Sequence, residues 1–222
     1  LSCMRHFYHY LVSVHNFESN PFEGVKGPQK SRRLPEFFTL EEVISLLEGN
    51  EKRSDPLAKR DQAILELLFA SGLRARELCS LHFSQIDFAR QTILIQGKGR
   101  KERIIPFGED LAGMIENYRL AKAEISTSAD TLFISNKGRS LTSHQVYIIV
   151  RNLMSMVTTR QKRSPHVLRH TFATTMLNDG ADVSAIKALL GHSSLAATQV
   201  YTHATFEQIK NIYQQSHPRG KK

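Results

Sequence analysis

A phenol and a set of cationic hydrogen-bond donors are spaced along this chain: Arg74, Lys98, His166, Arg169, His192 and Tyr201. A tyrosine hydroxyl is a nucleophile once its proton is removed. Guanidinium forks grip two phosphate oxygens together, and imidazoles donate hydrogen bonds or shuttle protons. These residue types are together suited to attack on a phosphodiester.

His166, Arg169 and His170 are spaced i, i+3 and i+4, which places them on one face of a predicted helix. His166 follows Ser164 and Pro165, an N-cap and first-turn pair, so the helix dipole and the free N–H groups there favour an anion. A metal site fits poorly, because His-x-x-Arg-His lacks the glutamate of the His-Glu-x-x-His pattern and Arg169 repels a cation. The alternative for this segment is surface histidines on a basic helix.

Arg74 follows Gly72-Leu73 in a predicted break between two helices, and Glu77 is placed three residues on to pair with it. Arg74 and Arg169 form a phosphate clamp only if the fold brings them together. Each residue also has a plainer interpretation when taken alone. Arg74 is then a structural salt-bridge partner, Lys98 a solvated charge and Tyr201 a core or rim tyrosine.

The distribution of charge indicates a polyanionic partner. The net charge is +9, and residues 1–130 contribute none of it because 18 basic side chains balance 18 acidic ones. Residues 131–222 hold 12 basic and 3 acidic side chains, and the segment 151–169 holds five basic side chains and no acid. Nucleic acid is the economical partner. The alternative is a basic surface that only keeps the protein soluble.

The elements that must position these residues are mostly helical. A capping box over 39–42 opens a helix through 47, and apolar periodicity predicts further helices. Two β-rich runs around the glycine-containing segment 97–102 predict a hairpin with a cationic tip. The expected elements are helices over 39–47, 60–71, 75–81, 109–124, 142–157, 165–179 and 183–190, strands over 92–95 and 103–106, a further helix carrying Tyr201, and a final amphipathic stripe of Phe206, Ile209, Ile212 and Tyr213.

The N-terminal part differs in composition. Residues 4–17 are rich in aromatic side chains at helical spacing, so we expect the last helix of something larger and a fragment that begins at Leu1. Residues 20–36 are rich in proline, glycine and basic side chains, which is typical of a linker. The two cysteines, Cys3 and Cys79, are interpreted as reduced thiols. No run of 18 apolar residues predicts a membrane span.

Five strings together resemble the tyrosine recombinase (phage integrase) family, and its bacterial Xer branch most of all. They are Gly72-Leu73-Arg74-x-x-Glu77-Leu78, Gly97-Lys98-Gly99-x-Lys101-Glu102-Arg103, His166-x-Leu168-Arg169-His170-x-Phe172-Ala173-Thr174, Leu190-Gly191-His192-Ser193 and Tyr201-Thr202-His203. The resemblance runs from about residue 1 to the end of the chain, with the motifs in the family's order. It implies a mainly α fold with a small antiparallel β-sheet near residues 83–107.

The resemblance implies a role for each motif residue. Tyr201 attacks the phosphate and forms a 3′-phosphotyrosine, while Arg74 and Arg169 clamp that phosphate. His166 and His192 donate hydrogen bonds or carry the tyrosine proton, and Lys98 protonates the leaving 5′-oxygen. Glu77 orients Arg74, and His170 braces the site from behind. The expected DNA contacts are Arg32, Arg33, Arg100, Lys101, Arg103, Arg160, Lys162 and Arg163.

The implied function is site-specific DNA recombination without a metal ion, ATP or other cofactor, in the resolution of chromosome dimers. The implied partners are a double-stranded recombination site, a homo- or hetero-tetramer with a partner recombinase, and a DNA translocase as activator, in the bacterial cytoplasm at the nucleoid. The domains expected are the last helix of a core-binding domain over 1–19, a linker over 20–36 and a catalytic domain over 37–222. The C-terminal helix is expected to dock on a neighbouring protomer, with packing on its own chain as the alternative.

Two other functions use the same features. A DNA-binding regulator has the same basic surface and does not cut. A type IB topoisomerase has the same chemistry and relaxes supercoils without matched sites. Covalent attachment separates an enzyme from a regulator, and recombination between two cloned sites separates a recombinase from a topoisomerase.

Overall fold

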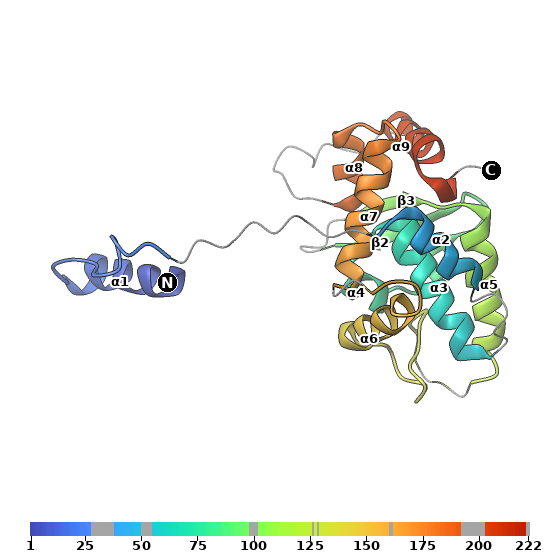
Figure 1. Cartoon of the computed structure of the whole chain (residues 1–222), viewed down its shortest axis with the longest axis horizontal. Coiled ribbons are helices and arrows are strands. Elements are labelled where there is room, and N and C mark those ends of the chain that lie inside the picture. The colour runs from blue at the N-terminus through green and yellow to red at the C-terminus, as the bar shows by residue number, and fades with distance from the viewer. Residues whose placement is uncertain are drawn as a thin grey trace. The chain divides into compact units, whose positions relative to one another are not determined.

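The computed structural model describes residues 1–27, 38–49, 55–97, 102–125, 127, 129–159, 162–191 and 203–220. The chain divides into two compact units, Leu1–Pro35 and Glu36–Lys222 (Figure 1). The division lies next to residue 37, where the catalytic domain was expected to begin. The assignment of the first unit to a core-binding domain stays a prediction.

The first unit is a helix with a short segment folded back on it. Helix α1 (Ser2–His15) ends at Asn16, whose left-handed backbone caps it. Within residues 20–27, expected as linker, the chain packs on α1: the Asn20 amide donates to the Arg5 carbonyl, and Arg5 Nε donates to the Phe22 carbonyl. No residue of α1 is buried, and Phe7 and other apolar side chains stay more than half exposed.

The second unit is mainly helical with one small sheet, which confirms the expected fold class. Its helices are α2 (Leu40–Gly49), α3 (Pro56–Ser71), α4 (Ala75–Cys79), α5 (Glu109–Lys122), α6 (Ser143–Met154), α7 (Pro165–Asn178), α8 (Val183–Leu190) and α9 (His203–Ser216), with 3₁₀ turns at Phe83–Gln85 and Pro218–Gly220. Its strands are β1 (Ile86–Asp87), β2 (Thr92–Gln96) and β3 (Glu102–Pro106), in the antiparallel order β1-β2-β3.

Helix α3 is the centre of this unit. Every residue from Ala63 to Ser71 is buried, as expected of a helix that is covered on all sides. Figure 1 shows α5 on one side of α3 and α7 on the other, and α3 contacts both. Because α7 carries Arg169 and the end of α3 leads to Arg74, this packing relates the two segments that carry the predicted phosphate clamp.

The start of α2 follows the predicted capping chemistry, and the bounds of several other helices differ from the prediction. The Thr39 hydroxyl accepts from the Glu42 N–H, and the Glu42 carboxylate accepts from the Thr39 N–H. Helix α3 begins before the predicted residue 60, because Asp55 caps it and Pro56 occupies its first turn. The helices predicted over 75–81, 109–124 and 142–157 end sooner, at Cys79, Lys122 and Met154 respectively.

The predicted hairpin is present. Strands β2 and β3 pair antiparallel, with Ile93 opposite Ile105 and Ile95 opposite Arg103. Residues 98–101 of its tip, with Lys98, lie outside the described residues. Alternate residues of β3 are buried, so Arg103 and Ile105 face the interior and Ile104 faces outward.

The C-terminal helix packs on its own chain, against α7, α8 and β3. Ile209 and Tyr213 of its predicted apolar stripe are buried. Beyond the helix, the His217 ring is fully buried and stacks on Tyr213 with ring centroids 5.0 Å apart. Arg219 then reaches Glu66 on α3 at 3.1 Å. This is the alternative weighed against docking on a neighbour, which stays a prediction for the assembled enzyme.

Glu66 predicts a pH-dependent stability. Burial raises its pKa from 4.5 to about 7, although the Arg219 charge opposes the shift. A carboxyl group whose pKa is raised in the folded state contributes its full stabilisation below the unfolded pKa. That contribution is lost as the pH rises through about 7. Glu66→Gln stays neutral at every pH. We therefore expect its free energy of unfolding in urea to rise relative to that of the wild type by up to ~3 kcal/mol between pH 5 and 8.

The control is Glu109→Gln on α5, an exposed carboxylate that should follow the wild type across this range. His217 titrates in all three proteins, so its contribution cancels in the difference. Parallel stability curves for the wild type and Glu66→Gln would contradict a raised Glu66 pKa.

Candidate functional site

The site begins where α3 ends. Gly72 closes α3 with φ +61, a left-handed conformation that suits glycine. A Cβ there would lie 2.7 Å from Leu190 Cδ2 and 2.8 Å from Phe172 Cδ1, so only glycine lets α3 end this close to α7 and α8. Arg74 follows as the N-cap of α4.

Glu77 holds Arg74 as its spacing predicted. Its Oε2 accepts from the Arg74 backbone N–H at 2.9 Å, and its Oε1 accepts from Arg74 Nη1 at 2.9 Å. Burial would raise the pKa of Glu77, but the hydrogen bonds and charge of Arg103, together with the hydrogen bonds from Arg74, bring it below the usual value. The Arg74 side chain stays 40% exposed, so its guanidinium can meet a ligand.

Arg169 is held by backbone carbonyls. It is buried on α7, where Nη1 donates to the Gly72 carbonyl and Nη2 donates to the Leu190 carbonyl. These two bonds join the end of α3 to the end of α8. They also place Arg169 beside the loop that carries Arg74, so the two arginines converge.

The group of charges is positive overall. Burial, together with the neighbouring charges of Arg74 and Arg103, lowers the pKa of Arg169 to about 10 against the attraction of Glu77. Three guanidinium groups thus meet one carboxylate. Partly buried cations that are not neutralised within the protein favour an anionic ligand. A phosphodiester has the matching charge and oxygen geometry.

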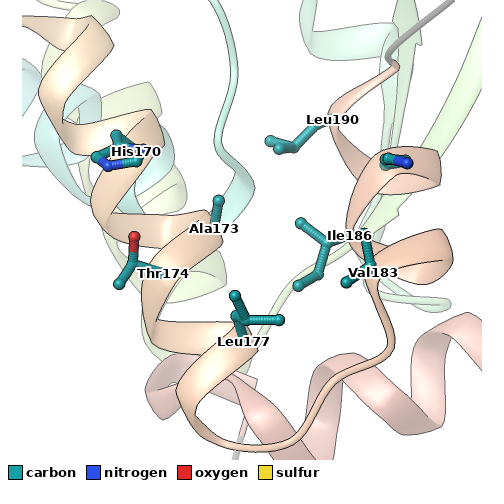
Figure 2. Close-up of a pocket in the computed structure, with 8 residues that line it drawn as sticks. His170, Ala173, Thr174, Leu177, Val183, Ile186 and Leu190 are labelled. Carbon is teal, nitrogen blue, oxygen red and sulfur yellow. The ribbon is translucent and has the colours of Figure 1, made fainter. Parts of the chain in front are cut away.

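Both helix α7 histidines are exposed. His166 lies in the first turn of α7, where the free N–H groups of a helix start favour an anion. His170 lies one turn on and lines a cavity of about 340 Å³ between α7 and α8. Figure 2 shows His170 on α7 opposite Leu190 on α8 in the upper part of the view, with Ala173, Ile186 and Leu177 below them. That lining is mostly apolar, so the cavity is not itself a phosphate site.

The structure accounts for part of the predicted site. It brings Arg74, Glu77 and Arg169 together, with His166 and His170 on the helix that carries Arg169. Lys98, His192 and Tyr201 lie outside the described residues, as do Arg32, Arg33, Arg100, Lys101 and Arg160. Of the other expected DNA contacts, Lys162 is exposed, and Arg163 is half-buried and donates to the Thr158 carbonyl. Their roles stay predictions.

Arg103 lies elsewhere than expected. It was expected among the DNA contacts, but its side chain is only 6% exposed and its fork is bound to Glu77. The buried side chain of Arg103 therefore does not lie on a DNA-facing surface, where it was expected. The alternation of β3, which puts Arg103 on the same face as Ile105, was the sequence signal that marked it as internal.

Residues 36–208 match the phage integrase family. The chain belongs to this family. A "Tyrosine recombinase XerC" of Bacillus pumilus (strain SAFR-032) is 42% identical over 226 residues, which cover 99% of this chain and 74% of that protein. The "Tyrosine recombinase XerC" of Bacillus subtilis (strain 168) is 39% identical over 227 residues, with the same coverage of both chains.

Solved recombinase structures share the fold. The crystal structure of XerA recombinase has a TM-score of 0.66 and 28% identity, covering 96% of this chain and 82% of that one. XerH site-specific recombinase, bound to palindromic difH substrate in a post-cleavage complex, has a TM-score of 0.68 and 26% identity, covering 85% and 56%. The family, the Xer branch and the resemblance to XerC, all expected from the motifs, are confirmed.

Across the described residues, no three His, Cys, Asp or Glu side chains gather as metal ligands would. In the same part of the chain, no helix has the length and apolar character needed to span a membrane.

Gly72 offers a test of how the site is assembled. Gly72→Ala adds a methyl group that clashes with Leu190 and Phe172 and strains the positive φ, so we expect a loss of roughly 2–4 kcal/mol in urea unfolding. Because the Gly72 carbonyl holds Arg169, the rate of strand cleavage should fall as well.

Two glycines provide controls. Gly180 has φ +85 with nothing within 4 Å of its Cβ position, so Gly180→Ala isolates the backbone strain. Gly113 lies in α5, and its Cβ position likewise has nothing within 4 Å. Gly113→Ala should therefore stabilise the fold by about 0.5–1 kcal/mol. A Gly72→Ala loss no larger than that of Gly180→Ala would show that the close packing at Gly72 is unimportant.

Proposed function

We propose that this chain is a site-specific DNA recombinase that cleaves and rejoins DNA through a 3′-phosphotyrosine. The observation that carries the proposal is the convergence of Arg74 and Arg169 in a positively charged group beside the N-terminus of α7. The names of the relatives support the reaction class, since they are tyrosine recombinases. A non-cleaving regulator has no need of converging arginines, and the names of the relatives favour a recombinase over a topoisomerase of the same chemistry.

The reaction needs one bond made and one broken at phosphorus. The Tyr201 oxygen attacks the scissile phosphate, and the bond from phosphorus to the 5′-oxygen breaks. The phenol proton passes to His166 or His192, and Lys98 gives a proton to the leaving 5′-oxygen. Rejoining is the reverse, with a 5′-hydroxyl attacking the phosphotyrosine.

The two arginines stabilise the transition state. The pentacoordinate phosphorus carries more negative charge than the ground state, and preorganised guanidinium groups meet that charge as it develops. Fixed cations then do what a metal ion does in other phosphoryl-transfer enzymes. The covalent intermediate keeps the energy of the phosphodiester, so strands rejoin without ATP.

The relatives also support the choice of partner. XerH was crystallised on difH DNA before and after cleavage. By analogy, this chain acts on a double-stranded recombination site as a homo- or hetero-tetramer with a partner recombinase. Resolution of chromosome dimers in the bacterial cytoplasm, with a DNA translocase as activator, is the cellular role that follows.

Tyr201→Phe tests the nucleophile. The substitution removes only the hydroxyl, so we expect DNA binding to persist and covalent attachment to disappear. The assay is trapping on a nicked site in EDTA without nucleotide, followed by mapping of the attached residue. A phosphotyrosyl peptide at Tyr8, Tyr118 or Tyr213, or a strict need for Mg²⁺, would contradict the proposal.

Lys98 is tested by a sulfur substrate. A 5′-alkoxide needs a proton as it leaves, whereas a thiolate is far less basic and leaves unaided. Lys98→Ala should therefore be nearly inactive on normal DNA and recover when the bridging 5′-oxygen is replaced by sulfur. Arg169→Ala, which loses charge stabilisation worth ~10²-fold in rate, should not recover equally. Without rescue of Lys98→Ala, the general acid is another group, with Lys101 the next candidate.

A further inference from the structure

We infer that Arg103 is a positioning residue for strand cleavage, which acts by neutralising Glu77 and by holding the end of α8. The inference rests on the proposed function and gives Arg103 a role other than the DNA contact expected from the sequence. Arg103 lies on β3, shortly after the hairpin tip that carries Lys98 in the sequence. Its contacts reach two other segments of the site.

The first contact frees Arg74 for the ligand. Arg103 Nη1 donates to Glu77 Oε1 at 3.0 Å and Nη2 donates to Oε2 at 2.8 Å, a two-pronged pair between side chains only 6% and 7% exposed. Arg74 binds the same two oxygens through Nη1 and its backbone N–H. Because Arg103 neutralises the carboxylate, the charge of Arg74 remains available to a phosphate. Without Arg103, Arg74 becomes the counterion of a buried carboxylate.

The second contact holds the segment that leads to His192. Arg103 Nε donates to the Leu189 carbonyl at 2.8 Å. Gly191, at φ +65, lies so close that a Cβ would be 3.1 Å from Arg103 Cδ and Nη1. The next carbonyl, that of Leu190, accepts from Arg169. Two arginines therefore fix consecutive carbonyls at the end of α8, immediately before His192 in the chain.

A purely structural role makes a different prediction. Buried ion pairs are often replaceable by apolar side chains of similar volume at little cost in stability, provided that no charge is left alone. Arg103→Met leaves the Glu77 charge to Arg74, so the fold keeps a paired carboxylate while the site loses one positive charge. Cleavage should then suffer much more than folding.

The experiment compares Arg103→Met with Arg60→Met. Arg60 is also buried, with 5% exposed, and donates to Asp61 and to the Ile134 carbonyl, and none of these contacts involves the site. We expect Arg103→Met to slow single-turnover covalent attachment by ~10²-fold or more, with the Kd for DNA changed less than about threefold. Arg60→Met should lower the melting temperature at least as much and leave the rate within about threefold of the wild type.

A double variant tests whether the effect passes through Glu77. In Arg103→Met with Glu77→Gln, no carboxylate remains to capture Arg74, so attachment should be faster than in Arg103→Met alone by about tenfold. If the two substitutions instead slow attachment independently, so that their fold-losses in rate multiply, the inference is contradicted. Equal rates for Arg103→Met and the wild type would contradict it as well.

A readout without cleavage separates this inference from the proposed function. Inorganic phosphate is titrated into the same variants, and the Arg74 Nε–Hε resonance is followed by NMR. Arg103→Met should bind phosphate at least fivefold more weakly than Arg60→Met. If the unsubstituted chain forms no covalent product but this difference holds, the proposed function fails, whereas the role of Arg103 in keeping Arg74 available to a phosphate stands. Equal phosphate affinity in both variants overturns the role of Arg103.

Discussion

Three guanidinium groups around one buried carboxylate are the constraint on which the rest of the site depends. Like charges in a poorly solvated place are costly, and the lowered pKa of Arg169 expresses that cost. The protein meets it with carbonyl oxygens and a single glutamate, which satisfy the N–H donors without cancelling all of the charge. In the proposed reaction the scissile phosphate supplies the missing negative charge, and the guanidinium groups are already in place to meet it.

The surrounding fold provides those carbonyl oxygens from the C-terminal ends of helices. The Gly72, Leu189 and Leu190 carbonyls all come from the last turns of helices or just beyond them, where carbonyls lack partners within the helix. Arginine side chains that bind them both satisfy these groups and complement the negative end of each helix dipole. The packing of α3 against α7 thus sets the positions of donors and acceptors together. An error in that packing would expose unpaired carbonyls as well as move Arg169.

Local features of the site were predictable from the sequence, and distant contacts were not. The pairing of Arg74 with Glu77 follows from three-residue spacing, and the start of α7 follows from Ser164 and Pro165. The convergence of Arg74 with Arg169 depends on helix packing, which spacing does not encode, so it rested on the family resemblance. Arg103 was misplaced because charge near a basic loop was given more weight than strand alternation. The apolar stripe of α9 indicated that the helix docks, but not on which surface.

Two helices, α8 and α9, flank the predicted nucleophile Tyr201 in the sequence, and different contacts hold them in place. Gly191 ends a helix that Arg103 and Arg169 hold, and His192 follows it directly. Tyr201 stands two residues before His203 in the sequence, and α9 begins at His203. Helix α9 is in turn fixed by Tyr213, His217 and Arg219, far from the guanidinium groups in the sequence. Because α9 also packs against α7, α8 and β3, which carry Arg169, the Leu190 carbonyl and Arg103, a displacement of α9 would disturb the group of guanidinium side chains as well.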